Sequence, residues 1–73
     1  MAKVSVELIF PSDLKNEPII HYIGQRFKII PNIIEASFST DMGWAILTLD
    51  GDREEIDRLF EYLKSKNITI KPR

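Results

Sequence analysis

Cysteine is absent from this chain of 73 residues, and histidine occurs only once, as His21. Without cysteine there are no disulfides, thiolate metal sites, iron–sulfur ligands or cysteine nucleophiles. A single histidine leaves most histidine-based metal and catalytic constellations without their second member. We therefore predict no catalytic residue, no metal site and no cofactor.

An excess of charge of one sign is also missing. Ten Lys and Arg residues face eleven Asp and Glu residues, for a formal net charge of −1. Nucleic-acid binding depends on a concentrated basic surface, so we expect no nucleic-acid partner. No apolar run reaches the roughly 18 residues of a membrane span, and the N-terminus lacks the apolar stretch of a signal peptide. We expect a cytoplasmic protein without membrane insertion.

The composition is that of one small globular domain over residues 1–73, with 44% hydrophobic and 29% charged residues. The pattern along the chain predicts four strands and two helices. In chain order these are a strand over 3–10, a helix over 17–27, strands over 28–40 and 44–50, a helix over 53–66 and a strand over 68–71. Phe10, Phe27, Phe38 and Phe60 are predicted to lie in the core.

Polar residues mark the ends of these elements. Asn16 or Glu17 is expected to cap the first helix, and Asp52 with Glu55 matches a capping box for the second. Asn67 suits the C-terminal end of that helix. A hairpin turn is expected over residues 40–43.

The order β-α-β-β-α-β predicts an α+β, ferredoxin-like fold, with a four-stranded antiparallel sheet and two helices on one face. Right-handed crossovers give the strand order 4-1-3-2, which places the second and fourth strands at the edges.

The sheet face away from the helices then receives Ile9, Trp44 and Ile46, together with Ile33. Scattered surface hydrophobic residues are one interpretation. The interpretation we favour is that a partner covers this face or an adjoining strand edge, because self-association adds core to a small domain.

Asn32 interrupts an apolar run from Ile29 to Ile34, where an amide is unfavourable unless it is hydrogen-bonded. The side chain either orders the helix-to-strand corner through a local backbone bond, or meets a ligand or partner chain at the edge strand.

This run, from Phe27 to Ala36, resembles the signature segment of the NIL domain family, with Asn-Ile-Ile in place of Asn-Ile-Leu. The similarity extends to the Leu8-Ile9-Phe10 strand, Pro18-Ile19-Ile20 at the first helix and Met42-Gly43-Trp44 at the hairpin. NIL domains are ACT-like modules of methionine-importing ABC transporter ATPases and of ferredoxin-linked proteins. The chain has neither an ATPase nor cluster-binding cysteines, and so resembles a free-standing representative.

The resemblance implies a homodimer that binds an amino acid such as methionine, with Asn32 at the ligand site near the dimer seam. Ile33, Ile34 and Phe38 are the expected apolar neighbours of the ligand. No Lys or Arg lies close to Asn32 in sequence, so backbone N–H groups or a partner chain would hold the ligand's carboxylate. The alternative is a protein-interaction module that docks to a ferredoxin-type or ABC-transporter partner without a small ligand.

Overall fold

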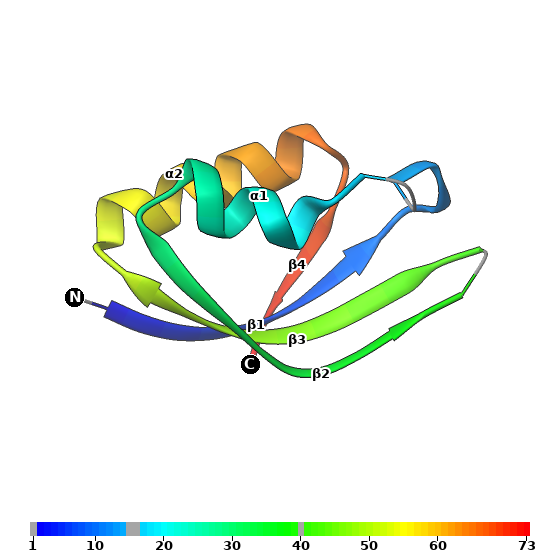
Figure 1. The fold of residues 1–73 in the computed structure, drawn as a ribbon, viewed down its shortest axis with the longest axis horizontal. Coiled ribbons are helices and arrows are strands. Elements are labelled where there is room, and N and C mark those ends of the chain that lie inside the picture. Colours follow the sequence, from blue (N-terminus) through cyan, green and yellow to red (C-terminus); the bar gives the residue numbers. More distant parts are fainter. Residues whose placement is uncertain (1, 15–16, 40) are drawn as a thin grey trace.

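The fold is described by a computed structural model that covers residues 2–14, 17–39 and 41–73 (Figure 1). The predicted order of strands and helices is confirmed, with one short 3-10 turn added after the first strand. The elements are β1 (Ala2–Phe10), η1 (Ser12–Leu14), α1 (Ile19–Arg26), β2 (Ile29–Phe38), β3 (Gly43–Gly51), α2 (Arg53–Ser65) and β4 (Thr69–Pro72).

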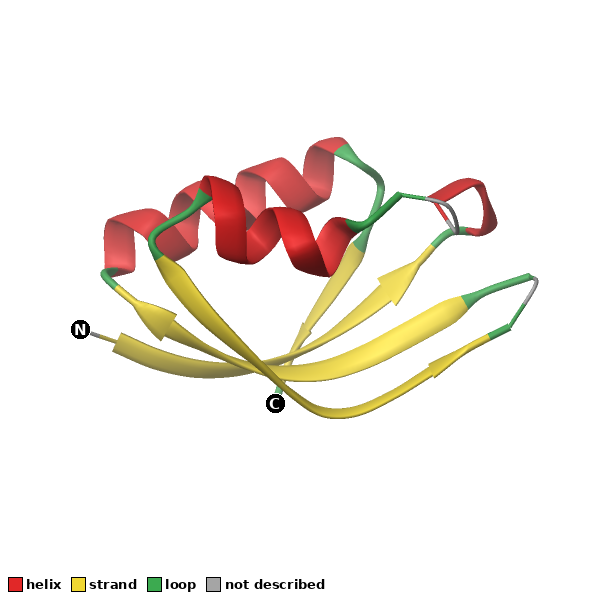
Figure 2. Cartoon of the chain, viewed as in Figure 1, coloured by secondary structure: helices red, strands yellow, loops and turns green. Residues whose placement is uncertain are grey.

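The four strands form one antiparallel sheet in the order β2-β3-β1-β4, and both helices lie on the same face (Figure 2). The α+β ferredoxin-like prediction is confirmed, including the edge positions of β2 and β4. The β2–β3 hairpin extends past the end of the helical layer (Figure 1).

Burial alternates along β3, whose odd-numbered residues are buried and whose even-numbered residues are half-buried. Because neighbouring side chains of a strand point to opposite faces, the odd-numbered residues of β3 face the helices. Leu8, Leu47 and Leu49 of the sheet and Ile56 and Leu59 of α2 are fully buried at the centre of this core.

The core prediction is wrong for Phe38, whose side chain is 61% exposed. Phe38 pairs with Gly43 at the tip of the β2–β3 hairpin, beyond the cover of the helices. A strand's apolar pattern does not show where the helical layer above it ends.

The predicted N-terminal caps of the two helices are confirmed only for the position of Asp52. α1 begins after Pro18 and has no side-chain cap within the described residues; Asn16 lies outside them, and the Glu17 carboxylate pairs with Lys66 instead. At α2 the N-cap is Asp52, as predicted, but the capping-box prediction is wrong because neither side-chain bond of the box forms. The Glu55 carboxylate is engaged elsewhere.

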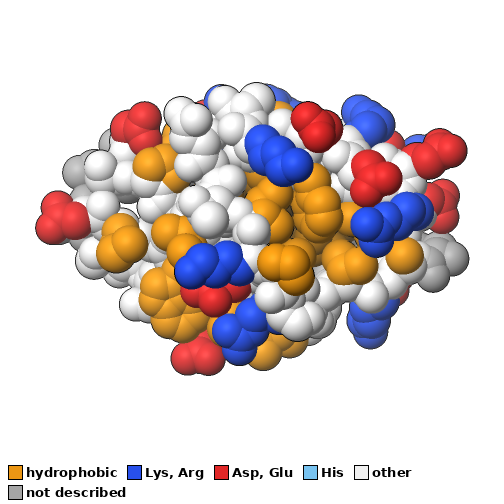
Figure 3. Space-filling model, turned by 180° about the vertical axis from the view of Figure 1, so that it is seen from behind, with side chains coloured by type: hydrophobic (Ala, Val, Ile, Leu, Met, Phe, Trp, Pro, Cys, Tyr) orange, Lys and Arg blue, Asp and Glu red, His pale blue; other side chains and the backbone are white. Residues whose placement is uncertain are grey.

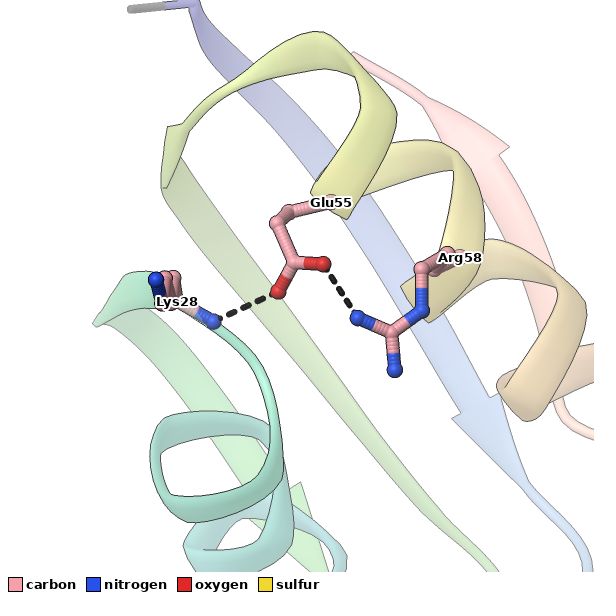
Figure 4. A network of polar contacts seen from close by, with 3 residues as sticks. All are labelled: Lys28, Glu55 and Arg58. Carbon is pink, nitrogen blue, oxygen red and sulfur yellow. Dashed lines mark hydrogen bonds and ion pairs between the residues drawn. The ribbon is translucent and has the colours of Figure 1, made fainter.

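Glu55 ties the start of α2 to the corner between α1 and β2 (Figure 4). Its Oε2 accepts a 2.8 Å hydrogen bond from the backbone N–H of Lys28, and its Oε1 pairs with Arg58. The Lys28 N–H bond, aided by the Arg58 guanidinium, holds the pKa of Glu55 below its ordinary value. The Arg58 guanidinium also lies 5.3 Å from the centroid of the Phe27 ring.

The C-terminal end of α2 follows the prediction for Asn67, which adopts a left-handed backbone conformation with φ 62°. Its N–H donates to the carbonyl of Lys64, and the Ile68 N–H donates to the carbonyl of Leu63. These two bonds form a Schellman motif that ends the helix and turns the chain into β4.

Candidate functional site

The β2 edge and the turn after it carry all the exposed large hydrophobic side chains of the described residues. These are Ile30, Ile33, Ile34, Phe38 and Met42, with 67%, 50%, 59%, 61% and 55% of their surface exposed. Glu35 is the one charged residue in β2. Proteins usually protect a long edge strand with charges or a cover, because its free N–H and C=O groups can pair with another chain. Over its ten residues β2 has Pro31, Glu35 and a β-bulge at Ile34 as protection, and its other exposed large side chains are hydrophobic.

The opposite edge is different. β4 has only four residues and includes Lys71 and Pro72. The next residue, Arg73, donates its backbone N–H to the carbonyl of Ser5, and its guanidinium forms an ion pair with Glu7. From behind, the hydrophobic side chains are interleaved with Lys, Arg, Asp and Glu (Figure 3). Of the two sheet edges, β2 is the longer and the richer in exposed hydrophobic side chains.

The four predicted ligand residues lie on β2 but not in one cluster. Asn32 pairs with Thr48, an even-numbered residue of β3, so its amide is on the face away from the helices. Ile33 and Phe38 pair with Leu47 and Gly43 and are on the helical side. Six residues of extended strand, about 20 Å, separate Asn32 from Phe38.

A β-bulge accounts for the position of Ile34. The register with β3 shifts between Ile33 and Glu35, and Ile34 has no partner in β3. Bulges bend and twist a strand locally. The local-cap interpretation of Asn32 is not supported, because its side chain makes no hydrogen bond within the described residues and is exposed.

A cavity of about 340 Å³ opens between the end of β1, the start of α1 and the tip of the β2–β3 hairpin. Its walls are mostly apolar, and its polar side chains are Ser12, Glu17, His21 and Ser39. The remaining lining residues are Phe10, Pro11, Leu14, Pro18, Ile19, Ile20, Phe38, Met42 and Gly43. Of the four predicted ligand residues, Phe38 lines this cavity and Asn32, Ile33 and Ile34 do not.

Two aromatic rings form part of the wall. The Phe10 and Phe38 ring centroids are 5.7 Å apart, with the rings tilted by 38°. The Ser39 hydroxyl closes the hairpin beside them by donating to the carbonyl of Met42 at 3.1 Å. Tilted rings at this distance stabilise each other.

The N-terminus of α1 forms another wall. The first intrahelical bond runs from the Tyr22 N–H to the Pro18 carbonyl at 3.1 Å. The N–H groups of Ile20 and His21 precede that bond and have no intrahelical acceptor. Both residues line the cavity, so backbone N–H groups with no acceptor among the described residues, and the positive end of the helix dipole, lie at its wall.

The charged groups at this end are held in place. Glu17 pairs with Lys66 at 3.1 Å, and the Glu17 carboxylate raises the pKa of Lys66 above its ordinary value. His21 is exposed, with its ring centroid 6.0 Å from that of Tyr22.

The three residues predicted to contact a partner, Ile9, Trp44 and Ile46, lie on the face away from the helices. Ile9 pairs with Trp44, and Glu7 pairs with Ile46, so all three hydrophobic residues are on that face. Ile33 is not among them, because it pairs with Leu47 on the helical side. Ile9, Trp44 and Ile46 are half-buried, and therefore less available than the β2 residues.

Sequence reasoning did not identify Phe10, Glu17, His21 and Met42 as neighbours in one cavity. They come from β1, the start of α1 and the hairpin, and no spacing rule connects these segments. One feature could have indicated the cavity. The hairpin that turns at Met42-Gly43 is longer than the helices that cover it, so its tip lies outside their cover.

The chain is thus a small antiparallel βαββαβ sandwich with a long apolar edge strand, β2, and an apolar cavity at the tip of the β2–β3 hairpin. The comparisons with known proteins identify its family. Residues 4–72 match the NIL domain, and the chain belongs to the NIL domain family.

The chain is 30% identical over 70 residues to an uncharacterized protein of Synechocystis sp. (strain ATCC 27184 / PCC 6803 / Kazusa), covering 93% of this chain and 72% of that protein. Its fold is similar to the crystal structure of the C-terminal domain of an ABC transporter ATP-binding protein from Enterococcus faecalis. That similarity has a TM-score of 0.79 at 22% identity and covers 94% of this chain and 81% of the other. The family match supports a regulatory module, and the 22% identical structure supports the fold. Over the described part of the chain, no helix has the length and apolar character needed to cross a membrane.

Proposed function

We propose that this chain is a homodimeric regulatory module that binds an amino acid, with methionine as the first candidate, in the cavity beside α1. One observation carries the proposal. The segment from β2 to Met42 carries the exposed large hydrophobic side chains and also supplies Phe38 and Met42 to the cavity wall. Dimer pairing and ligand binding would therefore use the same segment.

The β2 edge supports the dimer. Two copies related by a twofold axis can pair β2 with β2 in antiparallel fashion and extend the sheet across the seam, with the same patch used on both copies. This pairing covers Ile30, Ile33 and Ile34. Asn32 then lies at the seam on the face away from the helices, where its amide can bond to the partner chain.

The cavity supports the ligand. The N–H groups of Ile20 and His21, which have no acceptor among the described residues, suit a carboxylate, because helix N-termini favour anions. The described lining residues include no Lys or Arg, so these backbone groups would hold the carboxylate. An aliphatic or thioether side chain suits the space between Phe10 and Phe38, because sulfur makes favourable contacts with aromatic ring edges.

Regulation follows from the shared segment. A ligand that fixes Phe38 also orders the end of β2, and so stabilises the strand that forms the dimer seam. Linkage is reciprocal, so ligand should tighten the dimer by the same factor by which dimerisation tightens ligand binding.

Two alanine variants test where the ligand sits. Titration calorimetry with methionine should show that Phe38→Ala weakens binding strongly when the protein is held dimeric by high concentration. Asn32→Ala should weaken the dimer in sedimentation experiments and lower methionine affinity only through that loss. If Asn32→Ala abolishes binding while Phe38→Ala does not, the ligand lies on the strand edge, as the family resemblance alone suggests, and the cavity assignment is wrong.

The face away from the helices favours a second candidate function, a module that docks to a redox or transporter protein without a small ligand. Cross-strand pairing of Ile9 with Trp44, next to Ile46, is the observation behind it. In that case Trp44→Ala and Ile46→Ala would disrupt a complex with a ferredoxin-type or ABC-transporter ATPase partner, while no amino acid would perturb the protein.

A further inference from the structure

Gly43 lies directly beneath the aromatic wall of the cavity. Phe38 is its cross-strand partner, and the Phe38 ring rests on the Gly43 backbone. A Cβ at Gly43 would lie 3.3 Å from Cγ of Phe38 and closer than van der Waals contact to Cδ1 and Cε1. The ring and a side chain at position 43 cannot occupy these places together.

The ring, rather than the backbone, is the part that can give way. Phe38 is 61% exposed, so it can swing outward without breaking the core. Gly43 itself is buried at the start of β3, where it is paired on both sides with Phe10 and Phe38, and an aromatic ring over a strand glycine shields that part of the backbone. An added methyl group would move the ring away from Phe10 and open the wall of the cavity.

We infer that Gly43 is a positioning residue for ligand binding: its missing side chain lets the Phe38 ring lie inward against Phe10 and form one wall for an apolar ligand side chain. This inference rests on the proposed function for its ligand, a small amino acid with an aliphatic or thioether side chain. The position of the ring can be measured without any ligand.

Gly24 provides a matched control. It is exposed on α1, and a Cβ there would only reach ordinary contact with the Pro31 ring, at 3.8 and 3.9 Å. Gly24→Ala therefore adds the same methyl group to the same protein without touching the cavity. Phe38→Leu, alone and combined with Gly43→Ala, removes the ring with which the methyl group collides.

The first readout is proton NMR of the ligand-free chain. Wild type and Gly24→Ala should show nuclear Overhauser contacts between the Phe10 and Phe38 rings, and a Gly43 Hα shifted upfield by the Phe38 ring. Phe38→Leu should remove the upfield shift. Gly43→Ala should lose the ring–ring contacts while keeping the dispersed amide spectrum of the folded protein. Retention of those contacts in Gly43→Ala would overturn the inference.

The second readout is methionine affinity. Gly43→Ala should weaken binding by about three- to tenfold, the size expected for losing one sulfur–aromatic contact, and Gly24→Ala should leave it unchanged. In the Phe38→Leu background, adding Gly43→Ala should change affinity less than about twofold, because coupled residues are not additive. An equal loss in both backgrounds would contradict a role through Phe38. If wild type binds no amino acid, the proposed function fails. The ring contacts then still show whether Gly43 sets the position of the Phe38 ring.

Discussion

Truncation of Ile34 to alanine tests whether β2 forms the dimer seam. Ile34 is 59% exposed and has no partner in β3 because it lies at the bulge. Full burial of an isoleucine side chain stabilises by about 1.5–3 kcal/mol, so a partner that covers the exposed part gains about 1 kcal/mol per copy after allowing for the remaining Cβ. Because the substitution is present in both copies of a twofold dimer, the loss of dimerisation free energy doubles to about 2 kcal/mol, which corresponds to a roughly 30-fold weaker dimer.

Sedimentation equilibrium over a range of protein concentrations measures the dissociation constant of the dimer. Ile34→Ala should leave the stability of the monomer almost unchanged, because exposed substitutions usually alter it by no more than about 0.5 kcal/mol. Ile70→Ala on the other edge strand is the control: Ile70 is half-buried against the core, so its truncation should lower stability and spare the dimer. A dimer constant unaffected by Ile34→Ala would refute the reasoning.

Three further predictions concern the fold that holds the site. Asn67→Ala should lower unfolding free energy by about 1 kcal/mol in urea titrations and Asn67→Gly should not, because φ is 62° there. Since the folded pKa of Glu55 is lowered, its interaction with the Lys28 N–H stabilises the fold above the ordinary glutamate pKa and is lost as pH falls through the lowered value. Glu55→Gln should therefore be less stable than wild type in urea titrations at pH 6, and this difference should shrink as the pH is lowered. Leu59→Ala should cost about 2–5 kcal/mol by the same method, because the side chain is fully buried in α2.

The fold could be predicted because strand and helix periodicities differ and because β-α-β-β-α-β order with right-handed crossovers leaves few topologies. Alternation in β3 and the spacing of Ile56, Leu59 and Leu63 in α2 are each sufficient to place one face in the core. The role of Asn67 at the end of α2 could also be predicted from local sequence, since few residues other than glycine and asparagine tolerate its left-handed backbone conformation.

The site could be predicted only in part. The exposure of β2 depends on where the helical layer ends, and Phe38 looks like a core residue from its own strand alone. The capping box at α2 failed because a distant backbone N–H, that of Lys28, competes for the Glu55 carboxylate. Long-range competition of this kind has no local sequence signal.

The bulge at Ile34 is a further example. It shifts the strand by one residue, which puts Asn32 and Phe38 on opposite faces although six residues separate them. In an unbroken strand, residues an even number apart share a face. A regular strand would place Asn32, Ile34 and Phe38 on one face and Ile33 on the other, and the bulge separates Phe38 from Asn32 as well.

The most direct test of the central claim is a two-dimensional amide NMR titration of the wild-type chain with methionine and a panel of other amino acids. Saturable shifts should appear at Phe10, Ile20, His21, Phe38 and Met42 around the cavity, and their ranking across the panel would identify the ligand. The absence of shifts at concentrations well above cellular levels, or shifts confined to the face away from the helices, would contradict the proposed ligand-binding module.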